Sequence, residues 1–386
     1  MITLDFTDIP VIDNHCHTID PKKAILEAGS LAREFYHGIG DIPEDGVGER
    51  LWGATEELSR HFPNMGVVNT MVRQLSKLLG CAPTLEAVAS ERNRQTSKSF
   101  AAYTRRLYQD ARIVGTVLDS PLPRDDPALS LIPGKVLRLF QMSPAVKTLL
   151  GQSKSYREML DDFQGALARA VREDGFVGVK AHLAEEVGFG VEFDPVMEAS
   201  FSAAKAGDSN AFKGLYLAVF KETLLQCQKL GIPMHLHTGM TGGLWSGPLH
   251  DADPFLLLPL LRQHEYLRTK VVLLHGSHPW IQHASAVAHS LPHVWVDMSW
   301  TTPWTSLRLV EGFREVIGVM PLSKLMVGSG GHRTPEIAWL SAKTAKIALK
   351  EVLGDAVRLD ILDQVRAGEI GRMILHDNAA RLYGLD

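Results

Sequence analysis

The sequence has few of the features that mark secreted, membrane or nucleic-acid-binding proteins. Its 386 residues include 3 cysteines, at Cys16, Cys81 and Cys227, which are far apart and odd in number and so imply no disulfide framework. No apolar run approaches the roughly 18 residues of a membrane span, and the N-terminal stretch MITLDFTDIP lacks the regions of a signal peptide. The net charge is −4 without a basic block. We therefore expect a cytoplasmic protein with neither nucleic acid nor membrane as a partner.

Strand-like and helix-like segments alternate along the chain. Hydrophobic residues make up 45% and charged residues 22%, as in soluble enzymes. Short apolar runs, each followed by a helical pattern, predict eight strands: Pro10–Asn14, Arg112–Leu118, Lys135–Phe140, Phe176–Lys180, Ile232–His237, Lys270–His275, His293–Met298 and Lys324–Ser329. This alternation predicts an α/β protein with a parallel sheet, and eight units close naturally into a (β/α)8 TIM barrel. The reactive groups of such a barrel lie at the C-terminal ends of its strands.

Helical patterns occupy the intervals between the predicted strands. The expected helices are Tyr156–Glu173, Asn210–Leu230, Pro254–Leu267, Trp280–Ser290, Trp304–Val319 and Pro335–Leu353. Ser209 and Asn210 are the expected cap of the second helix, and Gly231 is its expected stop. Residues 21–110 contain only helical patterns, such as Asn69–Leu79 and Leu85–Tyr108. We expect one domain, 1–386, in which residues 21–110 form a helical insertion that caps the barrel mouth.

Histidines stand at the ends of three predicted strands. The first strand ends in Asp13-Asn14-His15-Cys16-His17, and residues two apart on a strand face the same side. His15 and His17 therefore project together and can chelate one divalent ion, although two ordinary surface histidines would give the same sequence pattern. A second pair, His235 and His237, ends the fifth strand, and His275 ends the sixth. Because packing explains such histidines poorly, their convergence predicts a metal site.

The fourth predicted strand ends in Gly178-Val179-Lys180. An apolar strand that ends in lysine usually carries a salt-bridged or snorkelling side chain. Beside a histidine cluster, Lys180 could instead be a neutral amine that reacts with carbon dioxide and bridges two metal ions as a carbamate. Both interpretations stay open at this point.

Taken together, these motifs resemble the amidohydrolase superfamily. The resemblance is to the amidohydrolase-related branch (amidohydrolase 2), which includes γ-glutamyl amide hydrolases and domains fused to glutamine synthetases. It extends over nearly the whole chain through DNHCH, GVK, HTG, LLHGSHP, VWVDMS and GSG…PE at the ends of strands 1, 4, 5, 6, 7 and 8, and through GRMIL and NAARLYGL near the C-terminus.

The resemblance implies a set of metal ligands and a reaction. It places His15 and His17 on one ion, carboxylated Lys180 as a bridge, and His237 and His275 on a second ion. The cofactor it implies is a divalent metal, zinc by expectation, with one or two ions and the Lys180 carbamate only in the binuclear case. His235 is then left to support the ligands or face the substrate. The implied chemistry is hydrolysis of an amide bond in a small molecule by metal-activated water.

One ligand of the family pattern is absent from the eighth strand. The pattern there is Gly/Ser-Ser-Asp, and its aspartate binds a metal ion and transfers protons, but in this chain Ser329 is followed by Gly330. A phosphate loop fits less well, because no lysine-threonine pair of the Walker type follows. Either the chain is a natural member that works with fewer ligands or another base, or the aspartate has been replaced. We favour replacement and expect a poor catalyst.

Several residues in the predicted loops are candidates for substrate contact. Trp280 and Trp304 begin helices and are expected to pack; the remaining candidates are His182, Trp245, His278, Trp300, His332 and Arg333. His278 is also a candidate for a catalytic role, since it lies three residues beyond His275. Arg333 could bind a substrate carboxylate or a surface acid. The adjacent Glu185 and Glu186 could receive an amine-bearing substrate if they face the pocket.

Three functions remain open from the sequence. The first is a metal-dependent hydrolase that acts on an amide, with γ-glutamyl amides as candidates. The second is a non-hydrolytic decarboxylase with one metal ion and no lysine bridge. The third is a catalytically silent metal-binding homologue. A small-molecule substrate is expected in the first two cases, and a homo-oligomer is left open.

Overall fold

The computed structural model describes residues 4–35, 60–123, 125–192, 196–240 and 249–385, and every structural statement below refers to these residues. All eight predicted strands are present: β1 (Val11–Cys16), β2 (Ile113–Asp119), β3 (Lys135–Gln141), β4 (Phe176–Ala181), β5 (Met234–Leu236), β6 (Val271–Leu273), β7 (Val294–Asp297) and β9 (Leu325–Met326). The structure adds a two-residue strand, β8 (Ser299–Trp300), and the last four barrel strands are shorter than predicted.

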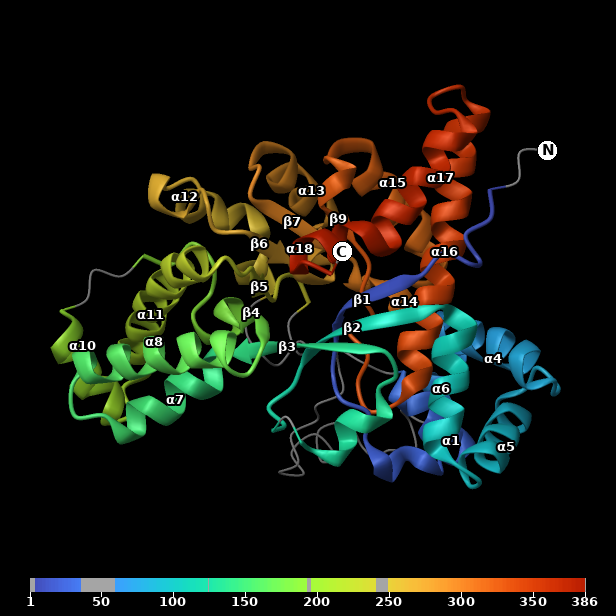
Figure 1. The fold of residues 1–386 in the computed structure, drawn as a ribbon, viewed down its shortest axis with the longest axis horizontal. Coiled ribbons are helices and arrows are strands. Elements are labelled where there is room, and N and C mark those ends of the chain that lie inside the picture. The colour runs from blue at the N-terminus through green and yellow to red at the C-terminus, as the bar shows by residue number, and fades with distance from the viewer. Residues whose placement is uncertain (1–3, 36–59, 124, 193–195, 241–248, 386) are drawn as a thin grey trace.

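The eight barrel strands pair in parallel in the order β1-β2-β3-β4-β5-β6-β7-β9 (Figure 1). Backbone hydrogen bonds then join β1 to the residues after β9: the Asn14 amide donates to Val327 O at 3.0 Å, and the Gly330 amide donates to His15 O at 2.7 Å. These bonds close the sheet into the predicted barrel. They also place the glycine-rich turn after β9 directly beside the end of β1.

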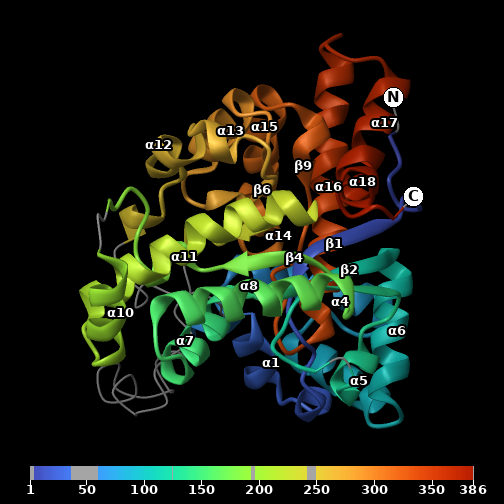
Figure 2. The same ribbon diagram turned by 60° about the vertical axis from the view of Figure 1, so that its left-hand side comes forward.

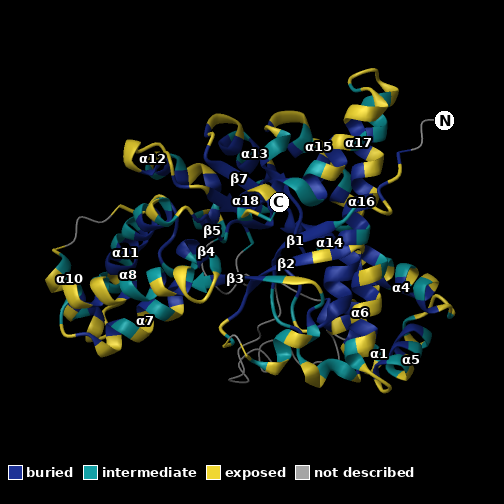
Figure 3. Cartoon of the chain, viewed as in Figure 1, coloured by how far each residue is buried: buried dark blue, intermediate teal, exposed yellow. Residues whose placement is uncertain are grey.

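Helices surround this barrel. Those after β2 are α7 (Met142–Gln152), α8 (Tyr156–Arg172), α9 (Leu183–Glu186), α10 (Met197–Lys205), α11 (Ser209–Leu230), α12 (Leu258–Leu261), α13 (Ile281–Ser290), α14 (Thr301–Trp304), α15 (Leu309–Val319), α16 (Pro335–Arg358), α17 (Gln364–Arg372) and α18 (Asn378–Tyr383). Figure 2 shows α8 and α11 running alongside β4. Burial follows this arrangement, because most strands are buried, apart from the partly exposed β3, whereas most helices bury one face and expose the other (Figure 3). No described helix is long and apolar enough to cross a membrane.

Four helix predictions need correction, of which one, Trp304–Val319, begins only at Leu309 as α15. The cap of α11 is Asp208, whose carboxylate accepts from the Asn210 and Ala211 amides at 2.9 Å, although Gly231 does end the helix with φ +71°. Prolines divide the predicted helix Pro254–Leu267 into short turns, of which α12 is the one α-helical piece. Leu85–Tyr108 is two helices, because Ser99 caps a new one.

Helices also fill the described part of the segment between β1 and β2. They are α1 (Ala28–Glu34), α4 (Gly66–Leu79), α5 (Leu85–Thr96) and α6 (Phe100–Ala111), and α6 packs against α16 (Figure 1). The role of residues 21–110 as a cap over the mouth stays a prediction, since residues 36–59 lie outside the described part of the chain.

Candidate metal centre

Side chains from four barrel strands meet at the C-terminal ends of those strands. The ring centroids of His15 and His17 are 5.0 Å apart, those of His15 and His275 are 5.2 Å apart, and those of His237 and His275 are 4.4 Å apart. Lys180 lies in the same cluster, because its Nζ is 2.7 Å from His182 Nε2 and the His182 ring is 5.6 Å from that of His237. The structure therefore brings all five predicted ligands together.

The facing of the first histidine pair depends on an irregularity in β1. Asp13 pairs with Thr116 but Cys16 pairs with Leu118, so β1 uses three steps where β2 uses two. Such a bulge re-aims the side chains that follow it. Asn14 points into the barrel, where its amide donates to Asp297 at 2.9 Å, and the bulge allows His15 to join the cluster as well. Alternation alone would have placed the neighbours Asn14 and His15 on opposite sides.

Two carboxylates complete the cluster. Ligand atoms of His15, His17 and Asp119 lie within 4.8 Å of one another, and those of His182, Glu185 and His237 do so as well. The sequence reasoning missed Asp119, because the second strand was predicted to end at Leu118, one residue too early. The available signal was the run Gly-Thr-Val-Leu-Asp, an apolar strand that ends in an acid as other strands end in histidine.

The buried imidazole of His15 fits a metal ligand. His15 is fully buried, and neither ring nitrogen has a hydrogen-bond partner among the described residues. An unpaired buried polar group costs about 1–3 kcal/mol, so a fold gains from having an ion bind there. Burial lowers the pKa of His15 well below its ordinary value, that of His17 to about 4 and that of His237 to about 3. All three rings are therefore neutral at pH 7, which is the form that binds metal ions.

His182 and His235 occupy different levels of the barrel. His182 contacts Lys180 directly and belongs to the second group of ligand atoms, so the structure places it in the cluster. His235 lies deeper, where its Nε2 is 2.9 Å from the hydroxyl of Tyr383 in α18 and the same hydroxyl contacts Asn14 Oδ1 at 2.5 Å. His235 therefore belongs to a hydrogen-bonded network beneath the cluster and lies in neither group of ligand atoms, and its expected role in supporting the ligands or facing the substrate stays a prediction.

The remaining candidates divide between the wall of the mouth and the outer surface. His332 stacks on His17 with ring centroids 3.7 Å apart, and the ring centroids of Trp300 and His278 are 5.4 Å apart. His278 also lines a cavity of about 290 Å³ together with Arg308. Arg333 instead forms an ion pair with Glu34 at 3.2 Å; the arginine is half exposed, whereas Glu34 is buried, so the acid it contacts is not a surface acid. Trp245 lies outside the described residues.

The two adjacent acids after β4 do not act as a pair. Glu185 Oε1 lies 3.1 Å from His237 Nδ1, and burial raises the pKa of Glu185 to about 7. Glu186 points away and contacts Lys147 at 2.6 Å. The pair therefore contributes a single carboxylate to the cluster.

The backbone at Gly330 suits glycine. Its φ is +61°, a conformation that side chains rarely adopt, and an added Cβ would lie 3.1 Å from the amide nitrogen of Trp300. An aspartate here would be strained and crowded against that backbone. This geometry supports the explanation that glycine is native to the site, and it weakens the replacement that the sequence favoured.

The fold and the cluster are those of a barrel enzyme with a candidate metal centre at the ends of its strands. Residues 159–385 match the family model described as amidohydrolase, which is more than half of the chain. The chain therefore belongs to the amidohydrolase family, as its motifs predicted.

The relatives agree at the level of fold. Protein fluG of Emericella nidulans is 22% identical over 420 residues that cover 98% of this chain and 46% of that protein, so the chain spans about half the length of this curated relative. A Lactobacillus casei protein provisionally described as a metal-dependent hydrolase superposes with a TM-score of 0.81 at 19% identity, covering 99% and 98% of the two chains. A uronate isomerase of Bacillus halodurans superposes with a TM-score of 0.69 at 15% identity, covering 98% and 94%.

Proposed function

We propose that the chain is a metal-dependent hydrolase that cleaves the amide C–N bond of a small molecule, with γ-glutamyl amides as the first substrates to test. Membership of the amidohydrolase family and the strand-end cluster support an enzyme of this type. The single observation that carries the proposal is His15, a buried imidazole without hydrogen-bond partners among the described residues, surrounded by further imidazoles and carboxylates.

The residues that would hold the metal are His15, His17, Lys180, His237 and His275, with zinc as the proposed ion. A divalent ion lowers the pKa of bound water towards about 7 and polarises a carbonyl oxygen. The chain positions several of these groups through fixed partners. Ser299 Oγ lies 3.0 Å from His275 Nδ1, and the stacked ring of His332 limits rotation of His17.

The wall of the mouth would bind the substrate. His278 and Trp300 present an imidazole and an indole beside each other, and Trp304 stacks on Trp300 with centroids 5.8 Å apart. A flat aromatic wall of this kind buries the apolar part of a ligand, while the imidazole offers a polar contact. These two residues would therefore orient the substrate, whereas Arg333, which pairs with Glu34, would not provide an anchor for its carboxylate.

The proposal also covers the cellular location, the domain organisation and the effect of Gly330. We place the enzyme in the cytoplasm and treat residues 1–386 as one barrel domain with residues 21–110 as its cap. The weak catalysis expected from Gly330 is tested by comparing the rates of the native chain and a Gly330→Asp variant.

Turnover in 18O-labelled water tests the reaction class. The zinc-loaded chain is incubated with γ-glutamyl amides and with simple amides, and mass spectrometry follows both products. The proposal expects release of the amine and incorporation of one 18O atom into the new carboxylate for each bond cleaved.

Three other outcomes would overturn this function. Release of carbon dioxide without 18O would indicate a decarboxylase. A product with the mass of its sugar acid substrate, from a parallel incubation with uronates, would indicate an isomerase. Absence of turnover on every amide while the zinc is fully bound would indicate a silent homologue.

A further inference from the structure

We propose that Asp119, at the end of β2, is a metal ligand and supplies the carboxylate that the family pattern places on the eighth strand. The inference rests on the proposed metal-dependent function and identifies one residue of its site. It explains how a chain with Gly330 at the usual aspartate position keeps a charged ligand.

The pairing of β1 and β2 places Asp119 beside the first histidine pair. Cys16 pairs with Leu118, so the residues that follow each of them, His17 and Asp119, are neighbours at the same edge of the barrel. The result is the group in which ligand atoms of His15, His17 and Asp119 lie within 4.8 Å of one another. Two neutral imidazoles and one carboxylate form a ligand set that zinc accepts, with a further position left for water.

One oxygen of the Asp119 carboxylate has a hydrogen-bond partner, and the other has only a longer contact. It is buried, and its Oδ1 accepts from Gln141 Nε2 at 2.6 Å. Its Oδ2 lies 3.4 Å from Lys180 Nζ, which is longer than a direct charge-assisted hydrogen bond of about 2.7–2.9 Å. Oδ2 therefore has an orientation fixed by Gln141 and keeps capacity to bind a cation.

Two further buried carboxylates near the strand ends, Asp13 and Asp297, already have local partners. Asp13 accepts from the amide and the hydroxyl of Ser329 at 2.7 and 2.6 Å. Asp297 accepts from the Ser299 amide at 2.8 Å and from Asn14. Asp13 thus fixes the turn that contains Gly330, whereas Asp297 fixes the backbone at Ser299. Among the described residues, Asp119 is the acid whose oxygens lie with the nitrogens of His15 and His17.

A structural role is the alternative for Asp119. In that case it only balances the charge of Lys180, and the histidines bind their ion without it. The two roles differ in a measurable way, because a ligand changes the metal affinity directly, whereas a counter-ion of Lys180 changes mainly the stability of the metal-free protein.

Metal affinity of two matched variants tests the inference. Asp119→Asn keeps an oxygen for Gln141 but removes the charge. Asp110→Asn is the control, because Asp110 also contacts a lysine, Lys343 at 3.1 Å, and accepts from a side-chain N–H, Trp339 Nε1 at 2.7 Å, away from the cluster. The full chain is stripped of metal and titrated with Zn²⁺ against a chromophoric chelator, and metal content is measured after dialysis.

We expect Asp119→Asn to weaken zinc affinity by at least about tenfold, whereas Asp110→Asn stays within about twofold of the native chain. If Asp119→Asn fails to fold, Asp119→Glu replaces it, and the same loss is expected because the oxygens move by one methylene. Native zinc affinity in the Asp119 variant that is tested would show that Asp119 is only a counter-ion and would overturn the inference.

Gly330→Asp provides the converse test. Because its backbone favours glycine and crowds an added side chain, we expect no gain in zinc affinity from this variant in the native background or with Asp119→Asn. Rescue of Asp119→Asn by Gly330→Asp would place the carboxylate back on the eighth strand and contradict the inference. These readouts are independent of turnover. If zinc binds through Asp119 but no amide is cleaved, only the proposed function is contradicted. If amides are cleaved and Asp119→Asn keeps the native zinc affinity, only the inference is contradicted.

Discussion

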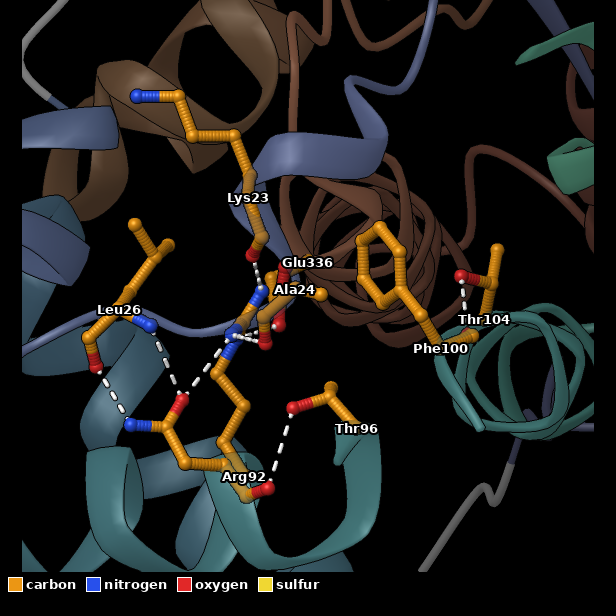
Figure 4. Close-up of polar contacts among 9 residues, drawn as sticks. Lys23, Ala24, Leu26, Arg92, Thr96, Phe100, Thr104 and Glu336 are labelled. Carbon is orange, nitrogen blue, oxygen red and sulfur yellow. Dashed lines mark hydrogen bonds and ion pairs between the residues drawn. The ribbon is translucent and has the colours of Figure 1, made fainter. Parts of the chain in front are cut away.

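Two buried polar clusters in this protein differ in how far they are satisfied. Arg92, in α5, lies beneath the surface between the β1–β2 segment and α16. Its guanidinium donates to Glu336 and to the carbonyl oxygens of Ala24 and Lys23, both at 2.8 Å (Figure 4). At the barrel mouth, by contrast, His15 is equally buried and has no partner on either nitrogen among the described residues.

This difference separates a structural cluster from a ligand site. The Arg92 cluster ties residues far apart in the sequence and gives each guanidinium nitrogen a partner, although Glu336 Oε2 has none among the described residues. The mouth collects imidazoles, a lysine and two acids, and some of their atoms stay without protein partners. Because an unpaired buried polar group costs free energy, such a cluster is stable only when the rest of the fold offsets the cost or a ligand binds. Variants in the two clusters should therefore differ in zinc affinity and in stability.

The largest effect is expected from His15→Leu. Loss of this ligand should reduce zinc affinity and the rate of the proposed hydrolysis by at least about 100-fold, since an ion contributes several kcal/mol to such a reaction. Without metal, the free energy of unfolding should stay within about 1 kcal/mol of the native value, because the variant removes no protein hydrogen bond. Titration with Zn²⁺ and urea unfolding measure the two quantities. His289→Leu, on the outer face, is the control and should leave zinc affinity unchanged.

Arg92→Met should give the opposite result. It leaves Glu336 buried without its cation, so the free energy of unfolding should fall by about 3–5 kcal/mol, while zinc affinity of the folded protein stays within about twofold. Arg94→Met is the matched control, because its ion pair with Glu91 is exposed and should contribute little to stability. Equal destabilisation by Arg92→Met and Arg94→Met in urea would contradict the structural role assigned to the cluster.

Zinc should stabilise the native chain and Arg92→Met alike. At a free concentration 100 times the dissociation constant, the expected gain is about 2.7 kcal/mol, which chelation should abolish. His15→Leu should show little of this gain at the same zinc concentration. Thermal unfolding with and without zinc provides the measurement, and an equal shift in His15→Leu would mean that zinc binds elsewhere.

The smallest effect concerns Lys324, a buried lysine that donates to Ala288 O and Leu291 O. Burial lowers its pKa from 10.5 to about 8. Between these values the unfolded chain holds more protons than the folded one, so the contribution of Lys324 to the free energy of unfolding increases as pH rises from 8 to 10.5. Lys324→Met should remove that increase, whereas exposed Lys22→Met should not. Parallel pH dependence in all three metal-free proteins would rule this out.

The sequence predicted the barrel well because its strands are local patterns. Each apolar run that ends in a polar residue could be read without knowing its neighbours, and the histidines on strands 1, 5 and 6 followed directly. The motifs also identified the family. Helix boundaries were less accurate where single residues decide them, as with Ser99 and Asp208.

The missing parts of the site depend on contacts between distant segments. The bulge in β1 appears only when its register with β2 is known, and a single acid at the end of β2 resembles any surface aspartate in the sequence. Similarly, the sequence does not show that Glu336, in the first turn of α16, is buried against Arg92. The reason why glycine suits position 330 is likewise a backbone angle, its positive φ, which a sequence does not show.

The position of the ion in a crystal of the zinc-loaded chain tests the central claim most directly. Anomalous scattering measured on both sides of the zinc absorption edge locates each ion without reference to the protein model. We predict a peak at the barrel mouth within bonding distance of His15, His17 and Asp119. A fully zinc-loaded crystal with no peak at the mouth, or with its peak bound by other residues, would contradict the account.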